Sequence, residues 1–216
     1  MRPSLLLFFL SAVTLLVFTF FSYTVAKERW QQFDFDTTVK LQDHLPRKYD
    51  QIFSYFSLLG SVEVTVGISI FFAFLALLKW KWWVILGWLM IVPATLAEVF
   101  GKLVLFHPGP PVLFHRSLLP TSLPSFYVHT DFSYPSGHMT RTIFIITILI
   151  CILLFSMRAV FPRTLLLVVL LSFVFLMALT RIYLGEHWFS DVLGGTLLGI
   201  SFGLFASVLI LAGKKG

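Results

Sequence analysis

The stretch Thr180-Arg181-Ile182-Tyr183-Leu184-Gly185-Glu186-His187-Trp188-Phe189-Ser190-Asp191 joins two apolar runs of this chain. A second polar stretch, Pro135-Ser136-Gly137-His138, stands at the start of another apolar run. Ionisable side chains within or beside membrane-spanning segments cost free energy and are functional by default. The two stretches therefore predict a shared polar site at the mouths of apolar helices.

The apolar runs indicate the class of protein. The chain has 216 residues, of which 58% are hydrophobic and 12% charged, and its mean hydropathy is +0.91; such values are typical of membrane proteins. A helix needs about 20 residues to cross the hydrocarbon core. Six segments are that long, so we predict an all-α, integral-membrane bundle of six transmembrane helices that forms one domain over residues 1–216. The segments are roughly Leu5 to Ala26, Ser57 to Leu78, Trp82 to Phe106, His138 to Met157, Thr164 to Ile182 and His187 to Leu211.

The basic residues predict the orientation of this bundle. Six spans place both termini and the connections after the second and fourth spans on one side. Basic residues without acidic ones occupy that side: Arg2, Lys79, Lys81, Arg158, Arg163, Lys214 and Lys215. The connection of residues 27–56, on the other side, has five basic and five acidic residues. The positive-inside rule then places both termini in the cytoplasm and the polar stretches at the extracytoplasmic face of the cell membrane.

The remaining composition excludes several classes. The net charge is +6, but the basic residues are scattered over the ends of the apolar runs. We therefore expect no nucleic-acid partner. Cys151 is the only cysteine, which leaves no disulfide framework and no thiolate metal cluster. Nothing in the chain indicates an obligate protein partner.

Two connections and two local features bear on the shape. Residues 27–56 interleave apolar and charged residues, which fits either an amphipathic helix at the interface or a solvated loop with apolar anchors. Residues 107–135 contain six of the ten prolines and predict an irregular segment that walls a site. We expect Pro93 to bend the third span, and the tryptophans near its start to form an interfacial belt: Trp80, Trp82, Trp83 and Trp88.

His187 and Asp191 carry the predicted chemistry. Their spacing of four residues places both side chains on one helix face. The carboxylate can accept the Nδ1 proton of the imidazole, which leaves Nε2 free to attack phosphorus. The alternative is a polar pair that merely links helices.

The tetrapeptide ending at His138 predicts a helix start with Ser136 as the N-cap and Gly137 allowing close approach of a ligand. A helix amino terminus favours an anion, and His138 can protonate a departing alkoxide. Arg181 and Lys102 lie on the same side, where they can neutralise a phosphoryl group.

These residues resemble the signature of the integral-membrane type 2 phosphatidic acid phosphatases: Lys-x6-Arg-Pro, Pro-Ser-Gly-His and Ser-Arg-x5-His-x3-Asp. The second part is present unchanged, and the third keeps every spacing with Thr180 in place of serine. In the first part Lys102 matches, but Gly109 stands where arginine is usual. His107, Arg116 and Arg141 are the candidates to replace that arginine.

The resemblance implies a lipid phosphatase with a phosphohistidine on His187, assisted by Asp191, and with His138 as general acid. It implies that Lys102, Ser136, Gly137 and Arg181 bind the phosphoryl group, without metal or cofactor. Phosphatidylglycerol phosphate is the favoured substrate, with phosphatidic acid and undecaprenyl pyrophosphate as the other candidates. The alternatives are a lipid phosphotransferase with the same intermediate, a non-enzymatic lipid or ion transporter, and a divalent-metal site on the two histidines and the aspartate.

Three glycines continue the spacing of His187 and Asp191 along the last span: Gly195, Gly199 and Gly203. Glycines at this spacing allow close approach of a neighbouring helix. We expect intramolecular packing here rather than a dimer interface, with part of the groove admitting an acyl or prenyl chain.

Overall fold

The computed structural model of the protein describes residues 3–119 and 132–213. Over these residues it contains α-helices, short 3-10 turns and one isolated β-bridge between Pro108 and Phe132. Six helical segments are long and apolar enough to span a membrane, which confirms the predicted all-α membrane bundle. They are Ser4–Ala26, Arg47–Leu77, Trp82–Leu105, Gly137–Ser156, Val160–Tyr183 and Phe189–Ala212.

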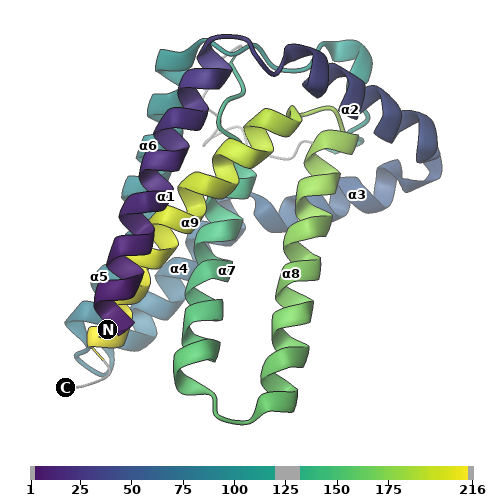
Figure 1. Ribbon diagram of the computed structural model, residues 1–216. Coiled ribbons are helices and arrows are strands. Elements are labelled where there is room, and N and C mark those ends of the chain that lie inside the picture. The colour runs from purple at the N-terminus through teal and green to yellow at the C-terminus, as the bar shows by residue number, and fades with distance from the viewer. Residues whose placement is uncertain (1–2, 120–131, 214–216) are drawn as a thin grey trace.

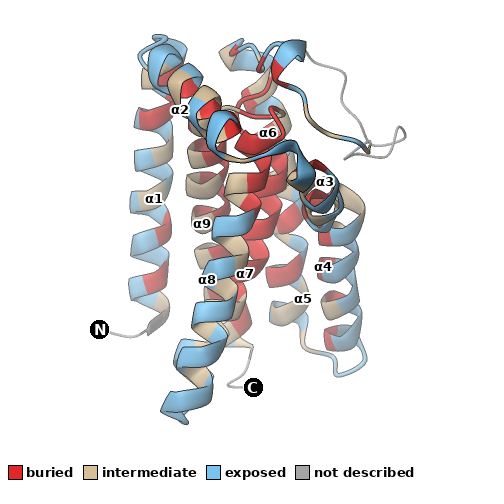
Figure 2. Cartoon of the chain, turned by 90° about the vertical axis from the view of Figure 1, so that its right-hand side faces the viewer, coloured by how far each residue is buried: buried red, intermediate tan, exposed pale blue. Residues whose placement is uncertain are grey.

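Helix α9 (Phe189–Ala212) lies at the centre of the bundle (Figure 1). It packs most extensively against α7 (Gly137–Ser156) and α1 (Pro3–Ala26), and also against α5 (Trp82–Leu89). Helix α8 (Val160–Tyr183) stands at the edge, with most of its length exposed and a buried last turn (Figure 2). The polar end of α8 is thus the part that the rest of the bundle encloses.

The glycines of α9 explain its close contact with α7. A Cβ added to Gly199 would lie 2.5 Å from the carbonyl oxygen of Thr140, and one added to Gly203 would lie 2.9 Å from that of Phe144. The predicted intramolecular packing is therefore correct. The predicted acyl or prenyl groove along this face is wrong, because the backbone of α7 fills it.

The third span is interrupted at Met90, between α5 and α6 (Ile91–Leu105). Pro93 is the third residue of α6 and cannot donate a backbone hydrogen bond to the preceding turn, so the predicted bend is found. Trp88 lies in the core and stacks on Phe72 with 4.7 Å between ring centroids. Its assignment to an interfacial belt is corrected, whereas Trp80, Trp82 and Trp83 are exposed.

The first long connection forms helix α2 (Gln31–His44), followed by α3 (Asp50–Ser57) and α4 (Val62–Leu77). The buried residues of α2 are all polar: Asp34, Thr38 and Gln42. Phe33 and Phe35 are instead exposed. Residues 31–44 thus form a helix rather than a loop, with a polar stripe that faces the protein and two phenylalanines that face outward.

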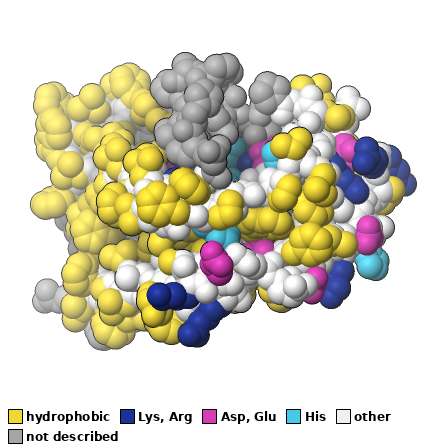
Figure 3. Space-filling model, turned by 90° about the horizontal axis from the view of Figure 1, so that it is seen from above, with side chains coloured by type: hydrophobic (Ala, Val, Ile, Leu, Met, Phe, Trp, Pro, Cys, Tyr) yellow, Lys and Arg dark blue, Asp and Glu magenta, His cyan; other side chains and the backbone are white. Residues whose placement is uncertain are grey.

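The two ends of the bundle differ in character. The beginning of α1, the end of α9 and the turns α4–α5 and α7–α8 lie at one end, and α2 and α3 lie across the other (Figure 1). Charged side chains of both signs gather at the α2 end among hydrophobic ones (Figure 3). Of the basic residues that predict the orientation, Arg2, Lys214 and Lys215 lie outside the described residues, as do Pro120 and Pro124 of the proline-rich connection.

Candidate active site

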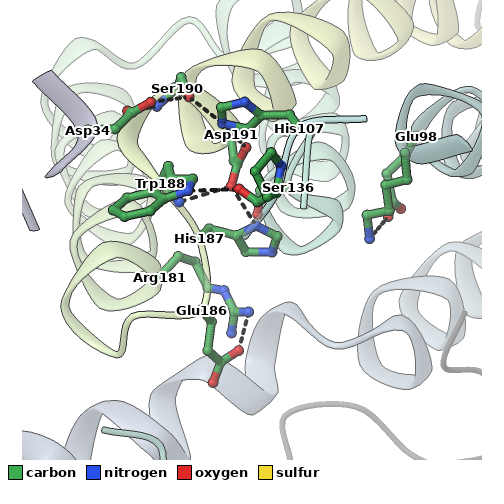
Figure 4. Close-up of polar contacts among 12 residues, drawn as sticks. Asp34, Glu98, His107, Ser136, Arg181, Glu186, His187, Trp188, Ser190 and Asp191 are labelled. Carbon is green, nitrogen blue, oxygen red and sulfur yellow. Dashed lines mark hydrogen bonds and ion pairs between the residues drawn. The ribbon is translucent and has the colours of Figure 1, made fainter. Parts of the chain in front are cut away.

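The predicted site residues converge at the α2 end of the bundle. The turn between α8 and α9 supplies His187, and the first turn of α9 supplies Asp191. The amino terminus of α7 supplies Ser136, Gly137 and His138. Figure 4 shows His187, Asp191 and Ser136 close together, with Arg181 on the side of Glu186.

His187 is oriented by Asp191. The Nδ1 atom of His187 lies 3.3 Å from Oδ2 of Asp191, and the same oxygen accepts a hydrogen bond of 2.9 Å from the backbone N–H of Trp188. Asp191 is fully buried. Its position in the first turn thus serves two purposes: the carboxylate satisfies an unpaired amide at the start of α9 and holds the imidazole.

The surroundings of His187 favour its neutral form. Burial is the largest cause that lowers the pKa of His187 well below its usual value, and the charges of Arg181, Lys102 and Arg141 lower it further. A neutral imidazole with Nδ1–H directed at a carboxylate has its lone pair on Nε2. In this arrangement Nε2 of His187 is unprotonated at neutral pH and can meet an electrophile only through its lone pair.

The Pro-Ser-Gly-His stretch begins α7, as predicted. Ser136 has the extended backbone of an N-cap residue, but its side chain makes no cap hydrogen bond. Its backbone N–H donates to the carbonyl oxygen of Asp191 at 3.0 Å, which fixes the start of α7 against α9. The Oγ atom of Ser136 is buried without a hydrogen-bond partner among the described residues, so it is available to a ligand.

Gly137 is required by a contact within the protein. A Cβ at this position would lie 2.5 Å from Oε1 of Glu98. The buried carboxylate of Glu98 thus lies against the amino terminus of α7, where a helix favours negative charge. The predicted close approach of a ligand to Gly137 remains untested, and the observed approach is that of Glu98.

His138 is 5% exposed, and its Nε2 atom has no hydrogen-bond partner in the described part of the chain. Its ring packs near Gly60, because a Cβ on that glycine would lie 3.0 Å from Cδ2 of His138. A buried, unpaired ring nitrogen at the start of α7 is suited to exchange a proton with a bound group.

Each cation of the site has a carboxylate partner. Glu98 binds Lys102 at 2.7 Å through Oε1 and Arg141 at 2.6 Å through Oε2. Arg181 pairs with Glu186 and donates to Oγ of Ser57. Pairing of this kind keeps buried cations in place where isolated charges would be costly.

The structure distinguishes the three candidates for the arginine that Gly109 replaces. Arg116 donates to the carbonyl oxygens of Leu45 and Gln42, so it holds the end of α2 instead of joining the cations around His187. His107 approaches Asp191, with 3.7 Å between Nε2 and Oδ1. Arg141 shares Glu98 with Lys102, and its charge acts on His187, so Arg141 is the best placed of the three.

Asp34 and Ser190 are additional residues that sequence reasoning did not select. The Oδ1 atom of Asp34 accepts from the backbone N–H of Ser190 at 2.8 Å, and Oδ2 accepts from its hydroxyl at 2.7 Å. Asp34 thereby caps α9 from a different helix. The polar stripe at four-residue intervals on α2, which includes Asp34, was the available signal.

A metal ion at the predicted site would be bound by the side chains of His138, His187 and Asp191. No group of three or more His, Cys, Asp or Glu side chains within residues 3–119 and 132–213 is arranged to hold one. The suggested grouping of His138, His187 and Asp191 as metal ligands is therefore not present in this arrangement.

Comparison with known proteins gives one family and two similar folds. Residues 82–214 match the family model of the PAP2 superfamily. The fold resembles a transmembrane PAP2 type phosphatidylglycerolphosphate phosphatase from Bacillus subtilis, with a TM-score of 0.69 and 17% identity over 95% of this chain and 94% of that chain. It also resembles LpxE from Aquifex aeolicus, with a TM-score of 0.57 and 23% identity over 81% of this chain and 94% of that chain. Comparison of the sequence with the curated proteins gives no significant match.

Proposed function

We propose that this chain, which belongs to the PAP2 superfamily, is a multi-pass membrane phosphatase that removes a phosphate from a lipid through a phosphohistidine on His187. The observation that carries the proposal is the buried His187–Asp191 pair, 3.3 Å apart, at the mouth of membrane-spanning helices. A nucleophile held by a carboxylate and surrounded by three cations is suited to attack a phosphoryl group.

In the first step Nε2 of His187 forms a bond to phosphorus as the bond between phosphorus and the lipid oxygen breaks. Asp191 stabilises the positive charge that develops on the imidazole. His138 donates its proton to the departing lipid oxygen. In the second step water attacks the phosphohistidine, His138 takes up a proton from that water, and His187 leaves as a neutral imidazole with inorganic phosphate as product.

The phosphoryl oxygens are bound by cations and by the start of α7. Lys102 and Arg181 supply positive charge, Arg141 supplies the charge that Gly109 lacks, and the hydroxyl of Ser136 and the amide of Gly137 donate hydrogen bonds. We expect this set to suffice without a metal ion, because side chains and amides provide the electrostatic stabilisation.

The membrane-spanning helices support a lipid as the substrate. Phosphatidylglycerol phosphate is the first candidate, and the similar fold of the phosphatidylglycerolphosphate phosphatase from Bacillus subtilis is compatible with it. Phosphatidic acid and undecaprenyl pyrophosphate are the other candidates. In this proposal the site faces the extracytoplasmic side of the cell membrane, and the distribution of basic residues supports that orientation.

Phosphate release from purified protein in detergent tests the proposal. The three lipids are supplied with and without excess EDTA, beside the His187→Ala variant. We expect release by the wild-type protein with either condition and none by the variant. Equal release by both proteins would refute the assigned nucleophile, and loss of activity in EDTA would refute metal independence. Adding acceptor alcohols and finding phosphorylated alcohol instead of free phosphate would identify a phosphotransferase.

A further inference from the structure

The carboxylate of Asp191 lies between two imidazoles (Figure 4). Its Oδ2 atom faces Nδ1 of His187 at 3.3 Å, and its Oδ1 atom faces Nε2 of His107 at 3.7 Å. Oδ1 has no hydrogen-bond partner among the described residues, although Asp191 is fully buried. A buried carboxylate oxygen needs a donor. The hydroxyl of Ser133, which acts on the Asp191 carboxylate, and the N–H of His107 at 3.7 Å are donors available to it.

Asp34 determines which atom of His107 carries the proton. Because the hydroxyl of Ser190 donates to Asp34 at 2.7 Å, only its lone pairs are directed toward His107, whose Nε2 atom lies 3.5 Å away. The neighbours of Nε2 are thus two acceptors, Ser190 Oγ and Asp191 Oδ1. This arrangement favours the tautomer of His107 with hydrogen on Nε2.

We propose that Asp34, Ser190 and His107 form a positioning arm that holds the carboxylate of Asp191 and sets the basicity of His187. The inference rests on the proposed function, since it concerns the same nucleophile. The arm is assembled from three elements: α2, the first turn of α9 and the segment after α6. His107, Ser190 and Asp34 are buried, with exposures of 7%, 0% and 1%.

The arm acts on His187 through charge as well as geometry. A donor at Oδ1 draws negative charge of the carboxylate away from Oδ2, so Asp191 stabilises the imidazolium form of His187 less strongly. The pKa of His187 therefore stays low and the ring stays neutral. The distance of 3.7 Å is long for a hydrogen bond, and such contacts often shorten when the substrate binds.

The groups that face His107 are compatible with a neutral ring. Burial lowers the pKa of His107, and the charge of Glu28, just beyond α1, opposes this. Burial raises the pKa of Asp34, and its two hydrogen bonds from Ser190 oppose that shift. Tyr134 contacts the ring of His107 edge-on, with 6.2 Å between centroids.

The groups that face His187 come from other elements. The cations are Arg181 at the end of α8, Lys102 on α6 and Arg141 on α7, and His138 interacts electrostatically with His187 from the start of α7. Variants of the arm leave these side chains unchanged. A change in the titration of His187 in such variants therefore reports on Asp191 and its support.

The test compares His107→Leu, which removes the donor, with His107→Gln, whose amide can still donate to Asp191. Asp34→Asn tests the same arm from α2. The asparagine amide would donate to the hydroxyl of Ser190, whose proton then turns to Nε2 of His107 and favours the other tautomer. Asp36→Asn on the same helix is the matched control, because within residues 3–119 and 132–213 the side chain of Asp36 bonds only to the exposed side chain of Gln32.

Two measurements are made on each variant. The first is the pH dependence of kcat/KM for phosphate release. The second is the pKa of His187 from nuclear magnetic resonance of proteins labelled at histidine, with the signal assigned by its loss in His187→Ala. The second measurement does not require turnover.

We expect His107→Leu and Asp34→Asn to lower kcat by about tenfold, as outer partners of orienting histidines do in metal sites. Both should raise the pKa of His187 and move the acid limb of kcat/KM to higher pH. In His107→Gln, kcat and the pKa of His187 should both lie closer to the wild-type values than in His107→Leu. Asp36→Asn should behave as the wild type. An unchanged pKa of His187 in folded His107→Leu and Asp34→Asn proteins would overturn the positioning arm. If His107→Leu does not fold, His107→Gln and Asp34→Asn decide the question.

The two proposals fail in different ways. If the wild-type protein releases no phosphate from any lipid while the pKa of His187 shifts as expected, the proposed function is wrong and the arm stands. If phosphate is released and the pKa is insensitive to both variants, the arm is wrong and the proposed function stands.

Discussion

The Oε2 atom of Glu98 lies 2.6 Å from Nη1 of Arg141, and both residues are buried. Because Glu98 also binds Lys102, its carboxylate balances two cations that act on His187. Removing one partner of a buried ion pair costs about 3–5 kcal/mol. We predict that Glu98→Gln lowers the thermal midpoint in detergent more than Arg141→Gln, since Glu98 retains Lys102 in the latter.

A double-mutant cycle provides the control for this prediction. Removing both charges in Glu98→Gln/Arg141→Gln should recover part of the stability lost in Glu98→Gln alone. Strictly additive losses would show that the two side chains are not energetically coupled, which would contradict the ion pair.

The pH dependence of turnover follows from the low pKa of His187. Burial lowers that pKa, and three cations lower it further, so protonation of the nucleophile requires a pH below the usual histidine value of 6.5. We predict that the acid limb of the kcat/KM profile, where activity falls as His187 becomes protonated, lies below pH 6.5, as measured by initial rates of phosphate release. An acid limb that lies above pH 6.5 would contradict the inferred neutral imidazole.

Arg141→Gln should shift the same acid limb in a defined direction. The positive charge of Arg141 disfavours protonation of His187, so its removal raises the pKa and moves the limb to higher pH. The comparison variant is Arg158→Gln, in the turn between α7 and α8 at the opposite end of the bundle. An identical acid limb in wild type and Arg141→Gln would remove Arg141 from the phosphoryl site.

The role of His138 depends on the leaving group. Its Nε2 atom, which has no hydrogen-bond partner in the portion of the chain that the structure describes, is proposed to protonate the lipid oxygen. General acids accelerate such a step by about 100-fold or more. We predict that His138→Ala loses at least that factor with a lipid phosphate and little with para-nitrophenyl phosphate, whose leaving group needs no proton. Equal losses with both substrates would exclude the acid role.

The contact between α7 and α9 predicts a difference between two glycines. A Cβ on Gly199 would lie 2.5 Å from a backbone oxygen of α7, whereas a Cβ on Gly67 of α4 would meet no atom of the described residues within 4 Å. Gly199→Ala should therefore lower the free energy of unfolding by about 1–3 kcal/mol, and Gly67→Ala should not lower it. Equal thermal midpoints for the two variants would argue against the tight packing.

Much of this fold follows from local properties of the sequence. Hydropathy over about 20 residues locates the spans, and Pro93 breaks the third span because proline lacks an N–H. The four-residue spacing of His187 and Asp191 places their side chains together once α9 begins at Phe189. Such features depend on few long-range contacts and can be predicted.

Features that depend on assembly could not be predicted in this way. Asp34 reaches Ser190 because α2 folds across the bundle, and His107 approaches Asp191 from the segment after α6. No sequence spacing links these residues. The polar stripe of α2 faces inward because Asp34 caps α9, against the usual expectation that apolar residues face the core. A tryptophan side chain is suited both to a protein core and to a membrane interface, so the residue type alone does not show which of the two positions Trp88 occupies.

The phosphohistidine tests the account most directly. The protein is mixed with a lipid labelled with ³²P in the phosphoryl group, and the reaction is stopped within the first turnover. The protein is then digested at alkaline pH, where phosphohistidine survives. The account predicts label on the peptide that contains His187, and no label in His187→Ala. Release of labelled phosphate at the normal rate with no label on His187 at any time would contradict it.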